Sequence, residues 1–377
     1  MLFQNALLFL PDGHFRLGDM RVNGEWIAEI GEKLSPLPGE EKVDCGRRKL
    51  TPGLSDIHTH GCRMHDFCEG TEEAFEAMAA CYIENGITTV CPTSMTLPVE
   101  RLEEIYLAYA RWMEKNPRGA RMIGINMEGP FISVAKKGAH EEKYIVPADI
   151  ESFKRLWAAS GGRIRLCDAA PEIPGNLDFI REAKDFCTIS IAHTAGSYEE
   201  VIAGFEAGAK GVTHLFNGMS GFSHRSPGCP GAAFDRAEYA ELICDGEHVL
   251  PSVLRAAVKL LGPERLVVIS DSVTPAGMPE GTRCTLGGEE VAVRGGRAEL
   301  PDGTIAGSIV NLLEEVRRLI GFGIPEETAL LGCTRNPARA IGAGEIGELA
   351  AGKRADLLLL GYDYRPARVY RDGVRYS

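Results

Sequence analysis

The middle of this sequence alternates repeatedly between short apolar runs and segments with helical spacing, and this alternation restricts the fold more than any other feature. Eight strand-like apolar runs occur, with helical patterns between them. Parallel strands joined by helices over roughly 250 residues predict a (β/α)8 TIM barrel, an α/β fold. The expected strands lie near residues 54–60, 87–95, 121–128, 164–170, 188–193, 211–216, 239–244 and 266–271.

Segments with the spacing of amphipathic helices lie between these apolar runs. Ser197 and Glu200 stand three positions apart at the start of one pattern, a spacing typical of a capping box at a helix N-terminus. A doubly wound parallel sheet is the main alternative fold, but no glycine-rich dinucleotide-binding loop follows the first strand. The expected helices include Glu72–Asn85, Val99–Lys115, Pro147–Ala159 and Ser197–Ala207.

The two ends of the chain differ from the middle, because short apolar runs there alternate with turn-forming residues. We therefore expect residues 1–51 and 346–377 to form one small β-sandwich subdomain beside a catalytic barrel of residues 52–345. The turn signals are Pro11–Gly13, Asn23–Gly24, Pro38–Gly39 and Arg371–Val374.

The composition argues against two classes of partner. The 377 residues carry a formal net charge of −12, so long-range attraction to nucleic acid or to an anionic membrane is not expected. No apolar run approaches the roughly 18 residues of a membrane-spanning helix, and no basic residues precede the first apolar run as they would in a signal peptide. The 11 cysteines include no C-x-x-C pair, which favours reduced thiols and a cytoplasmic location over a disulfide framework.

The first expected barrel strand ends in a His-x-His pair, His58 and His60. Alternate residues of a strand face the same side, so both imidazoles point together at the C-terminal end of that strand. Barrel enzymes keep their chemistry at this end. Taken by itself, the pair is as consistent with ordinary core or surface histidines as with a metal site.

Four more ligand-type residues close other expected strands, and the whole set favours a metal site. They are Glu128, His193, His214 and Asp271. A barrel brings strand ends to one rim, where polar groups buried without partners would be costly. Imidazole and carboxylate ligands without cysteine suit Zn²⁺, with Fe²⁺ as an alternative, in a catalytic site that keeps a position open for water. Such an ion lowers the pKa of water to about 7, and Asp271 is placed to take up the proton, to bind the ion, or both.

Several segments resemble the N-acetylglucosamine-6-phosphate deacetylases, a family of metal-dependent barrel hydrolases in the amidohydrolase superfamily. The resemblance covers nearly the whole chain and is most specific in Glu128–Phe131 combined with Thr213–Asn217. The other matching segments are Pro52–Leu54 with the His-x-His pair, Lys136–His140, Ala192–Thr194, Gly218–Met219, Arg225 with Pro227–Gly228, Asp245–Val249, Ser270–Asp271 and Ala306–Ser308.

The resemblance implies hydrolysis of N-acetyl-D-glucosamine 6-phosphate to D-glucosamine 6-phosphate and acetate. In this family a glutamate and two histidines hold the metal, which implies Glu128, His193 and His214 here. A second ion would be held by His58, His60 and Asp271, so one or two ions per subunit are expected. Asp271 would also transfer the proton to the leaving nitrogen.

On the substrate side, the resemblance implies that His140 stabilises the oxyanion during catalysis. The phosphate is expected to contact His248, Asn217 with Gly218, and Arg225. Arginine suits phosphate because its planar fork binds two oxygens, and in this family it reaches the site of the partner subunit of a homodimer. The remaining expected substrate-binding residues are Ala139, Ile305, Ala306 and Gly307.

Two positions depart from the family pattern and leave room for a different acylated amino sugar. Ser226 stands where the family often has glutamate, and Gly218 stands where alanine is common. A second hypothesis is a cyclic-amide or N-acyl-amino-acid hydrolase of the same superfamily, which Arg225 and His248 disfavour. A third is a catalytically inactive scaffold, but such proteins typically lose metal ligands and none is missing from this sequence.

Overall fold

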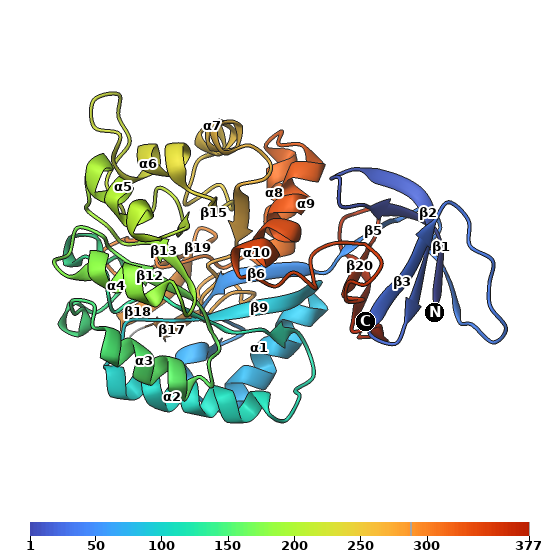
Figure 1. Cartoon of the computed structure of the whole chain (residues 1–377), viewed down its shortest axis with the longest axis horizontal. Coiled ribbons are helices and arrows are strands. Elements are labelled where there is room, and N and C mark those ends of the chain that lie inside the picture. Colours follow the sequence, from blue (N-terminus) through green and yellow to red (C-terminus); the bar gives the residue numbers. More distant parts are fainter. Residues whose placement is uncertain (287–288, 377) are drawn as a thin grey trace.

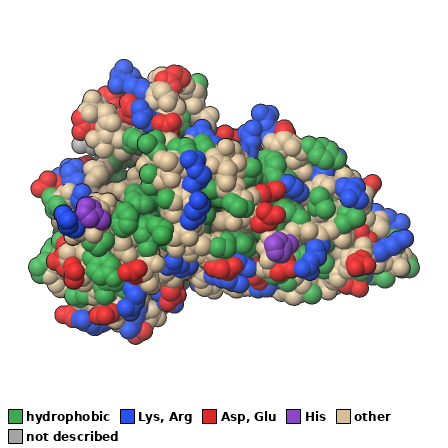
Figure 2. Space-filling model, turned by 90° about the horizontal axis from the view of Figure 1, so that it is seen from above, with side chains coloured by type: hydrophobic (Ala, Val, Ile, Leu, Met, Phe, Trp, Pro, Cys, Tyr) green, Lys and Arg blue, Asp and Glu red, His purple; other side chains and the backbone are tan. Residues whose placement is uncertain are grey.

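The computed structural model describes residues 1–286 and 289–376 and divides the chain into two parts. The large part, on the left of Figure 1, consists of strands surrounded by helices, and the small part on the right consists of strands. Both termini lie in the small part. The same parts form the broad half and the tapered end of Figure 2, where acidic and basic side chains are interspersed over the surface.

All eight expected barrel strands are present, so the predicted (β/α)8 barrel is confirmed. They pair in parallel in the order β6, β9, β11, β12, β13, β14, β15 and β16, and a short β10 also pairs with β9. The third expected strand is therefore split into β10 and β11. The bounds are β6 Leu54–Thr59, β9 Ile87–Ser94, β10 Arg121–Met122, β11 Ile125–Met127, β12 Ile164–Ala169, β13 Thr188–Ile191, β14 Gly211–Val212, β15 Tyr239–Ile243 and β16 Leu266–Ile269.

Backbone hydrogen bonds between the ends of β16 and β6 close the barrel. The amide of Asp271 donates to the carbonyl of His58 at 3.0 Å, and the amide of His60 donates to the carbonyl of Ser272 at 2.8 Å. Asp271 and the His-x-His pair come from opposite ends of the barrel sequence. The closure brings them side by side.

Helices cover the outside of the barrel (Figure 1). In α2, buried Leu102, Ile105, Tyr106 and Tyr109 follow the spacing of one helical face, which explains why this segment packs on the strands. The capping box predicted at Ser197 is present. The helix bounds are α1 Glu72–Glu84, α2 Val99–Met113, α3 Ile150–Ala159, α4 Asn176–Ala183, α5 Tyr198–Ala207, α6 Gly228–Arg236, α7 Pro251–Leu261, α8 Leu312–Gly321, α9 Glu326–Cys333 and α10 Arg335–Ala340, with 3-10 turns at Phe67–Glu69, Val134–Lys136 and Glu142–Tyr144.

The small part joins strands from both chain ends, as expected, in the order β22-β21-β20-β5-β1-β2-β3 with β4 also on β1. Hydrogen bonds connect all of them into one sheet. The rings of Phe3 on β1 and Tyr370 on β21 are 5.0 Å apart although two strands separate β1 from β21, so the sheet curves around its own apolar core. The division at residues 51 and 346 stays a prediction. The bounds are β1 Leu2–Phe9, β2 Phe15–Asn23, β3 Trp26–Gly31, β4 Lys42–Asp44, β5 Lys49–Pro52, β20 Leu357–Leu360, β21 Pro366–Arg371 and β22 Val374–Arg375.

Two small sheets at the mouth of the barrel were not expected from the sequence. A hairpin of β7 (Gly61–Cys62) and β8 (His65–Asp66) directly follows the His-x-His pair. A three-stranded antiparallel sheet of β17 (Arg283–Leu286), β18 (Glu289–Arg294) and β19 (Arg297–Glu299) lies between β16 and α8 in the chain. Its apolar residues pack with Met95 and Val273 beside the barrel rim.

None of the helices in the described part of the chain combines the length and apolar character that a membrane crossing requires.

Arg121 links the barrel to the small sheet, and its removal should destabilise the protein. Its guanidinium lies 2.5 Å from a carboxylate oxygen of Asp356 and 2.5 Å from one of Asp372, with the Asp356 side chain only 3% exposed. We expect Arg121→Ala to lower the free energy of unfolding by about 3 kcal/mol, because a buried carboxylate loses its partner. Denaturant unfolding monitored by circular dichroism measures this. The exposed ion pair of Arg16 with Asp12 is the control, and an equally large loss in Arg16→Ala would contradict the argument.

Candidate metal centre and substrate cavity

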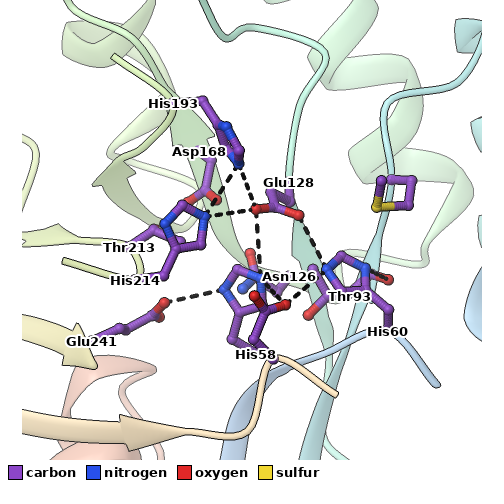
Figure 3. A network of polar contacts seen from close by, with 12 residues as sticks. His58, His60, Thr93, Asn126, Glu128, Asp168, His193, Thr213, His214 and Glu241 are labelled. Atoms are coloured by element: carbon purple, nitrogen blue, oxygen red, sulfur yellow. Dashed lines mark hydrogen bonds and ion pairs between the residues drawn. The ribbon is translucent and has the colours of Figure 1, made fainter. Parts of the chain in front are cut away.

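The expected ligand residues stand at strand ends in an unusual backbone conformation. His193, His214 and Asp271 have φ angles of 43°, 31° and 44°. This left-handed region is costly for most residues with a side chain, although histidine and aspartate enter it more often than most. The chain thus turns sharply after β13, β14 and β16. Figure 3 shows the His193 and His214 side chains directed toward Glu128.

Glu128 is the centre of this cluster. Its Oε1 atom lies 3.0 Å from His193 Nε2 and 3.0 Å from His214 Nε2, and its Oε2 atom lies 3.2 Å from His60 Nε2 (Figure 3). His58 Nε2 is 3.6 Å from Oε1. One carboxylate from the end of β11 therefore contacts imidazoles from three other strand ends.

Backbone carbonyls fix the orientation of three of these imidazoles. A carbonyl oxygen can only accept, so each ring donates from Nδ1, and the Nε2 lone pair is left for a cation. The pairs are His193 with Lys136 at 2.7 Å, His214 with Asn217 at 3.1 Å and His60 with Thr93 at 3.2 Å.

The arrangement fits a bound divalent cation. His193 Nε2 and His214 Nε2 are 3.2 Å apart and share Glu128 Oε1, so three lone-pair atoms face one another. His58 Nε2 is buried and has no hydrogen-bond partner among the described residues. Lone pairs this close repel unless a proton or a metal cation lies between them. Imidazole and carboxylate donors suit Zn²⁺ or Fe²⁺.

His140 differs from the other histidines of the cluster. Its Nδ1 accepts a hydrogen bond from the backbone amide of Thr96 at 3.2 Å, and its Nε2 faces Glu128 Oε2 at 3.5 Å. Burial lowers the pKa of His140 to about 4, so the ring is neutral at pH 7. A neutral ring that accepts at Nδ1 carries its proton on Nε2. In this geometry His140 presents an N–H at the centre, although His140, Glu128 and His193 also offer ligand atoms close enough together to hold an ion.

Asp271 completes a second group with His58 and His60. Its Oδ1 atom is 3.3 Å from His60 Nε2 and 3.6 Å from His58 Nε2. Burial alone would raise the pKa of Asp271, but the contact with His60 and the charge of His58 hold it below its usual value. The side chain is 13% exposed, so an ionised carboxylate borders the cavity and can accept a proton.

A cavity of about 190 Å³ adjoins the centre and gathers most of the expected substrate-binding residues. Gly307 allows the segment after β19 to lie against the strand end that carries Asp271. Its φ is 73°, and a Cβ there would lie 2.9 Å from the carbonyl oxygen of Asp271. The expected residues that line the cavity are Ala139, His140, Asn217, Gly218, His248, Ile305, Ala306 and Gly307.

His248 lines this cavity with a carboxylate behind it. Its Nδ1 donates to Asp245 Oδ2 at 2.7 Å. Burial alone would lower the pKa of His248, but this hydrogen bond raises it above its ordinary value of 6.5. The ring is thereby favoured as a cation, which suits an anionic ligand group.

Gly218 lies against one of the imidazole rings of the cluster. Its φ is 57°, and a Cβ would lie 2.8 Å from His193 Nδ1, so alanine would press against a ligand ring. The neighbouring amide of Asn217 donates to the carbonyl of His214 at 2.9 Å and is therefore committed to a turn. Of the two amides expected to contact phosphate, the Gly218 amide has no hydrogen bond among the described residues.

Arg225 does not reach the cavity of its own subunit. It lies in an exposed turn closed by hydrogen bonds between Ser223 and Ser226, in the loop before α6, and is not among the residues that line the cavity. In this conformation Arg225 does not contribute to the cavity wall of its own subunit.

Several residues of the site were missed by sequence reasoning. Glu241 accepts from His58 Nδ1 at 3.1 Å, as Figure 3 shows, and the Thr96 amide and the Asp245 carboxylate orient His140 and His248. The sequence offered a signal for Glu241, because a carboxylate interrupts the apolar run of β15 and must find a buried partner. No side-chain signal exists for Thr96, which acts through its backbone. The other cavity residues that were missed are Met95, Gly138, Val273, Leu286 and Thr304.

The sequence model of the amidohydrolase family matches residues 50–375. This match covers most of the chain, and the strand-end imidazoles and carboxylates occupy the mouth of a barrel. The chain belongs to the amidohydrolase family.

Its curated relatives are deacetylases of phosphorylated amino sugars. The chain is 34% identical to N-acetylglucosamine-6-phosphate deacetylase of Bacillus subtilis (strain 168), over 96% of this chain and 93% of the relative. It is 33% identical to N-acetylgalactosamine-6-phosphate deacetylase of Escherichia coli O157:H7, over 82% of this chain and 83% of the relative.

A solved structure agrees with this grouping. An aspartate-to-alanine variant of N-acetyl-D-glucosamine-6-phosphate deacetylase from Mycobacterium smegmatis, in complex with N-acetyl-D-glucosamine-6-phosphate, matches with a TM-score of 0.91 and 29% identity. The match covers 100% of this chain and 98% of that chain.

The hydrogen-bond pattern predicts which histidines hold metal. His193→Ala and His214→Ala should lose most of the bound metal, because each removes an Nε2 lone pair from the centre. His140→Ala should keep it, because His140 presents a proton there. Elemental analysis of the purified variants measures this and identifies the ion. Loss of metal from His140→Ala would contradict the assigned proton position.

Proposed function

We propose that this protein hydrolyses N-acetyl-D-glucosamine 6-phosphate to D-glucosamine 6-phosphate and acetate, with a divalent metal ion as cofactor. One observation carries the proposal: a single cavity joins a cluster of metal-ligand atoms to His248, an imidazole whose Nδ1 is hydrogen-bonded to Asp245. The first suits an amide carbonyl and the second suits a phosphate. The relatives named for this reaction support it.

Glu128, His193 and His214 would hold one ion, and His58, His60 and Asp271 supply atoms close enough for a second. Zn²⁺ is the expected ion, with Fe²⁺ as the alternative. When bound, such an ion polarises the amide carbonyl and lowers the pKa of water. Glu241, through its hydrogen bond to His58, keeps that ring oriented.

Two residues of the chain handle charge and protons during the reaction. Asp271 is ionised and borders the cavity, so it takes a proton from the attacking water and delivers it to the leaving nitrogen. His140 directs its Nε2–H into the cavity, where it donates to the oxygen on which negative charge develops. A donor preorganised in this way contributes about 3 kcal/mol to such reactions.

The phosphate end of the substrate meets His248 and the amide of Gly218. Because the whole chain carries a net charge of −12, phosphate recognition depends on local donors of this kind. Arg225 is the third phosphate ligand and comes from the partner subunit of a homodimer. Its loop also exposes Phe222 by 55%, an aromatic surface typical of protein interfaces.

We place the enzyme in the cytoplasm. The 11 cysteines are all free, and ten of them have pKa values raised by their surroundings, as expected of thiols used for packing in a reducing compartment.

Acetate release from a panel of sugars tests the proposed reaction. The panel contains N-acetylglucosamine 6-phosphate, N-acetylgalactosamine 6-phosphate and the two unphosphorylated sugars. We expect the first to be the best substrate. Preference for the galactose epimer would favour the second candidate function, which the E. coli relative supports. Equal kcat/KM with and without phosphate would refute the phosphate site.

Asp271→Asn should abolish most turnover while leaving the protein metal-bound. The amide cannot accept the proton of water, so we expect kcat to fall roughly 100- to 10,000-fold. The remaining ligands of the Glu128 group are unaffected. Steady-state kinetics with metal analysis of the same sample measures both, and near-wild-type kcat would exclude the proton-transfer role.

Phosphate binding should depend on pH through His248. The protonated ring binds phosphate, and its pKa is raised, so KM should be constant at low pH and increase as pH rises through that raised pKa. Asp245→Asn removes the carboxylate that raises the pKa of His248. The increase should then begin at lower pH, with KM at neutral pH about 10-fold higher. The unphosphorylated sugar is the control, and an unchanged pH profile for the variant would contradict the pairing.

Mixed dimers test the contribution of Arg225. Arg225→Ala should raise KM about 10-fold or more. A hybrid of one Arg225→Ala subunit and one Asp271→Asn subunit has one intact site if the arginine crosses the interface, and none if it acts within its own subunit. Recovery of activity on mixing therefore supports the proposal, and its absence contradicts it.

A further inference from the structure

The thiols of Cys62 and Cys81 line a second cavity, which is separate from the cavity at the metal centre. Cys62 on β7 and Cys81 on α1 both line a cavity of about 360 Å³, and β7 packs against α1. Both are free, with exposed fractions of 3% and 7%. The volume is several times the roughly 30 Å³ of a water molecule, so a small solute can enter.

Cys81 differs from every other cysteine of the chain. A hydrogen bond from Cys62 and the charge of Arg63 lower the pKa of the Cys81 thiol, whereas the other ten cysteines have raised pKa values. Thiols are nucleophilic as thiolates, and a neighbouring cation favours that form.

The hairpin that carries Cys62 is connected to the metal centre. The amides of His60 and Gly61 donate to the carbonyl of Ser272 at 2.8 and 3.0 Å, and the Ser272 hydroxyl donates to the carbonyl of Gly61 at 2.9 Å. Ser272 follows Asp271 directly. A displacement of Cys62 is therefore transmitted to His60 and Asp271 through a short chain of hydrogen bonds.

The turn of this hairpin is also conformationally restricted. Arg63 and Met64 have φ angles of 49° and 68°, and their amides donate to the carbonyls of Ala276 and Thr274. The hairpin is thus fixed to the segment after Asp271, so it cannot absorb a movement of Cys62 by relaxing on its own.

We propose that Cys62 and Cys81 form a peroxide-sensitive thiol pair, whose oxidation to a disulfide displaces the strand end that carries His60. The sulfur of Cys81 attacks one oxygen of a hydroperoxide, the O–O bond breaks, and an alcohol or water leaves with a proton. The sulfur of Cys62 then attacks the resulting sulfenic acid and expels water. Two thiols and one hydroperoxide give one disulfide, one alcohol and one water.

The experiment uses the full-length, zinc-loaded protein exposed to hydrogen peroxide. Alkylation of free thiols and peptide mapping should find a Cys62–Cys81 disulfide with a mass lower by two hydrogens. Metal affinity should fall about 10-fold or more, as for other disturbances behind a ligand, with a parallel loss of acetate release. Dithiothreitol should restore both. Absence of the disulfide would overturn the proposal.

Variants separate this pair from general oxidation. Cys81→Ser should keep basal activity and bound metal. It should form no disulfide, and its activity should resist peroxide. Cys81→Ala is a second variant if serine disturbs packing. Cys187→Ser, which alters a half-buried cysteine in another cavity, should remain as sensitive as the unaltered chain. Equal inactivation of Cys81→Ser would overturn the link to the metal centre. Disulfide mapping and metal content do not depend on the substrate, so they remain informative if the proposed deacetylation fails.

Discussion

The convergence of lone pairs on Glu128 is the interaction on which the rest of this structure depends. Its carboxylate lies 3.0 Å from two imidazole nitrogens that are themselves 3.2 Å apart. A divalent cation would neutralise these facing lone pairs, and binding of such an ion would offset the strain of the strand ends that bring them together. Closure of the barrel between β16 and β6 then adds Asp271 to the same centre. The fold and the chemistry are linked at this point, because the same strand ends complete the barrel and present the ligands.

The hydrogen bond at Nδ1 of each imidazole determines whether its Nε2 atom carries a lone pair or a proton at the centre. Three histidines donate from Nδ1 to backbone carbonyls, whereas His140 accepts there from the amide of Thr96. Both kinds of ring face Glu128 at similar distances. The proposed roles nevertheless differ, because the position of the ring proton determines whether Nε2 can bind a cation or donate to an oxyanion.

The proposed phosphate-binding residues His248 and Gly218 line the same cavity as this centre but are different residues from its expected ligands. The protein is acidic, so under the proposed function anion recognition would rely on His248 backed by Asp245, on the Gly218 amide and, in the proposed dimer, on Arg225. The sheet of β17 to β19 contributes part of the cavity wall through Leu286, while the segment after it supplies Ala306 and Gly307. The Cys62–Cys81 pair lines a different cavity from the one at the metal centre, and the proposed effect on metal binding would pass through the hydrogen bonds of the hairpin rather than through contact with substrate.

The sequence by itself determined the barrel and its ligand set. Eight apolar runs separated by helical patterns predict parallel strands, and the strand ends of a barrel must meet at one rim, so Glu128, His193, His214 and Asp271 can be grouped from the sequence alone. The sequence could not predict the short strands β17 to β19, which lack a continuous apolar run, or the continuity of the small sheet. Tertiary structure alone decided the pairing of His58 with Glu241, the proton on His140 and the distance of Arg225 from its own cavity. These depend on contacts between residues far apart in the chain, and no local pattern encodes such distances.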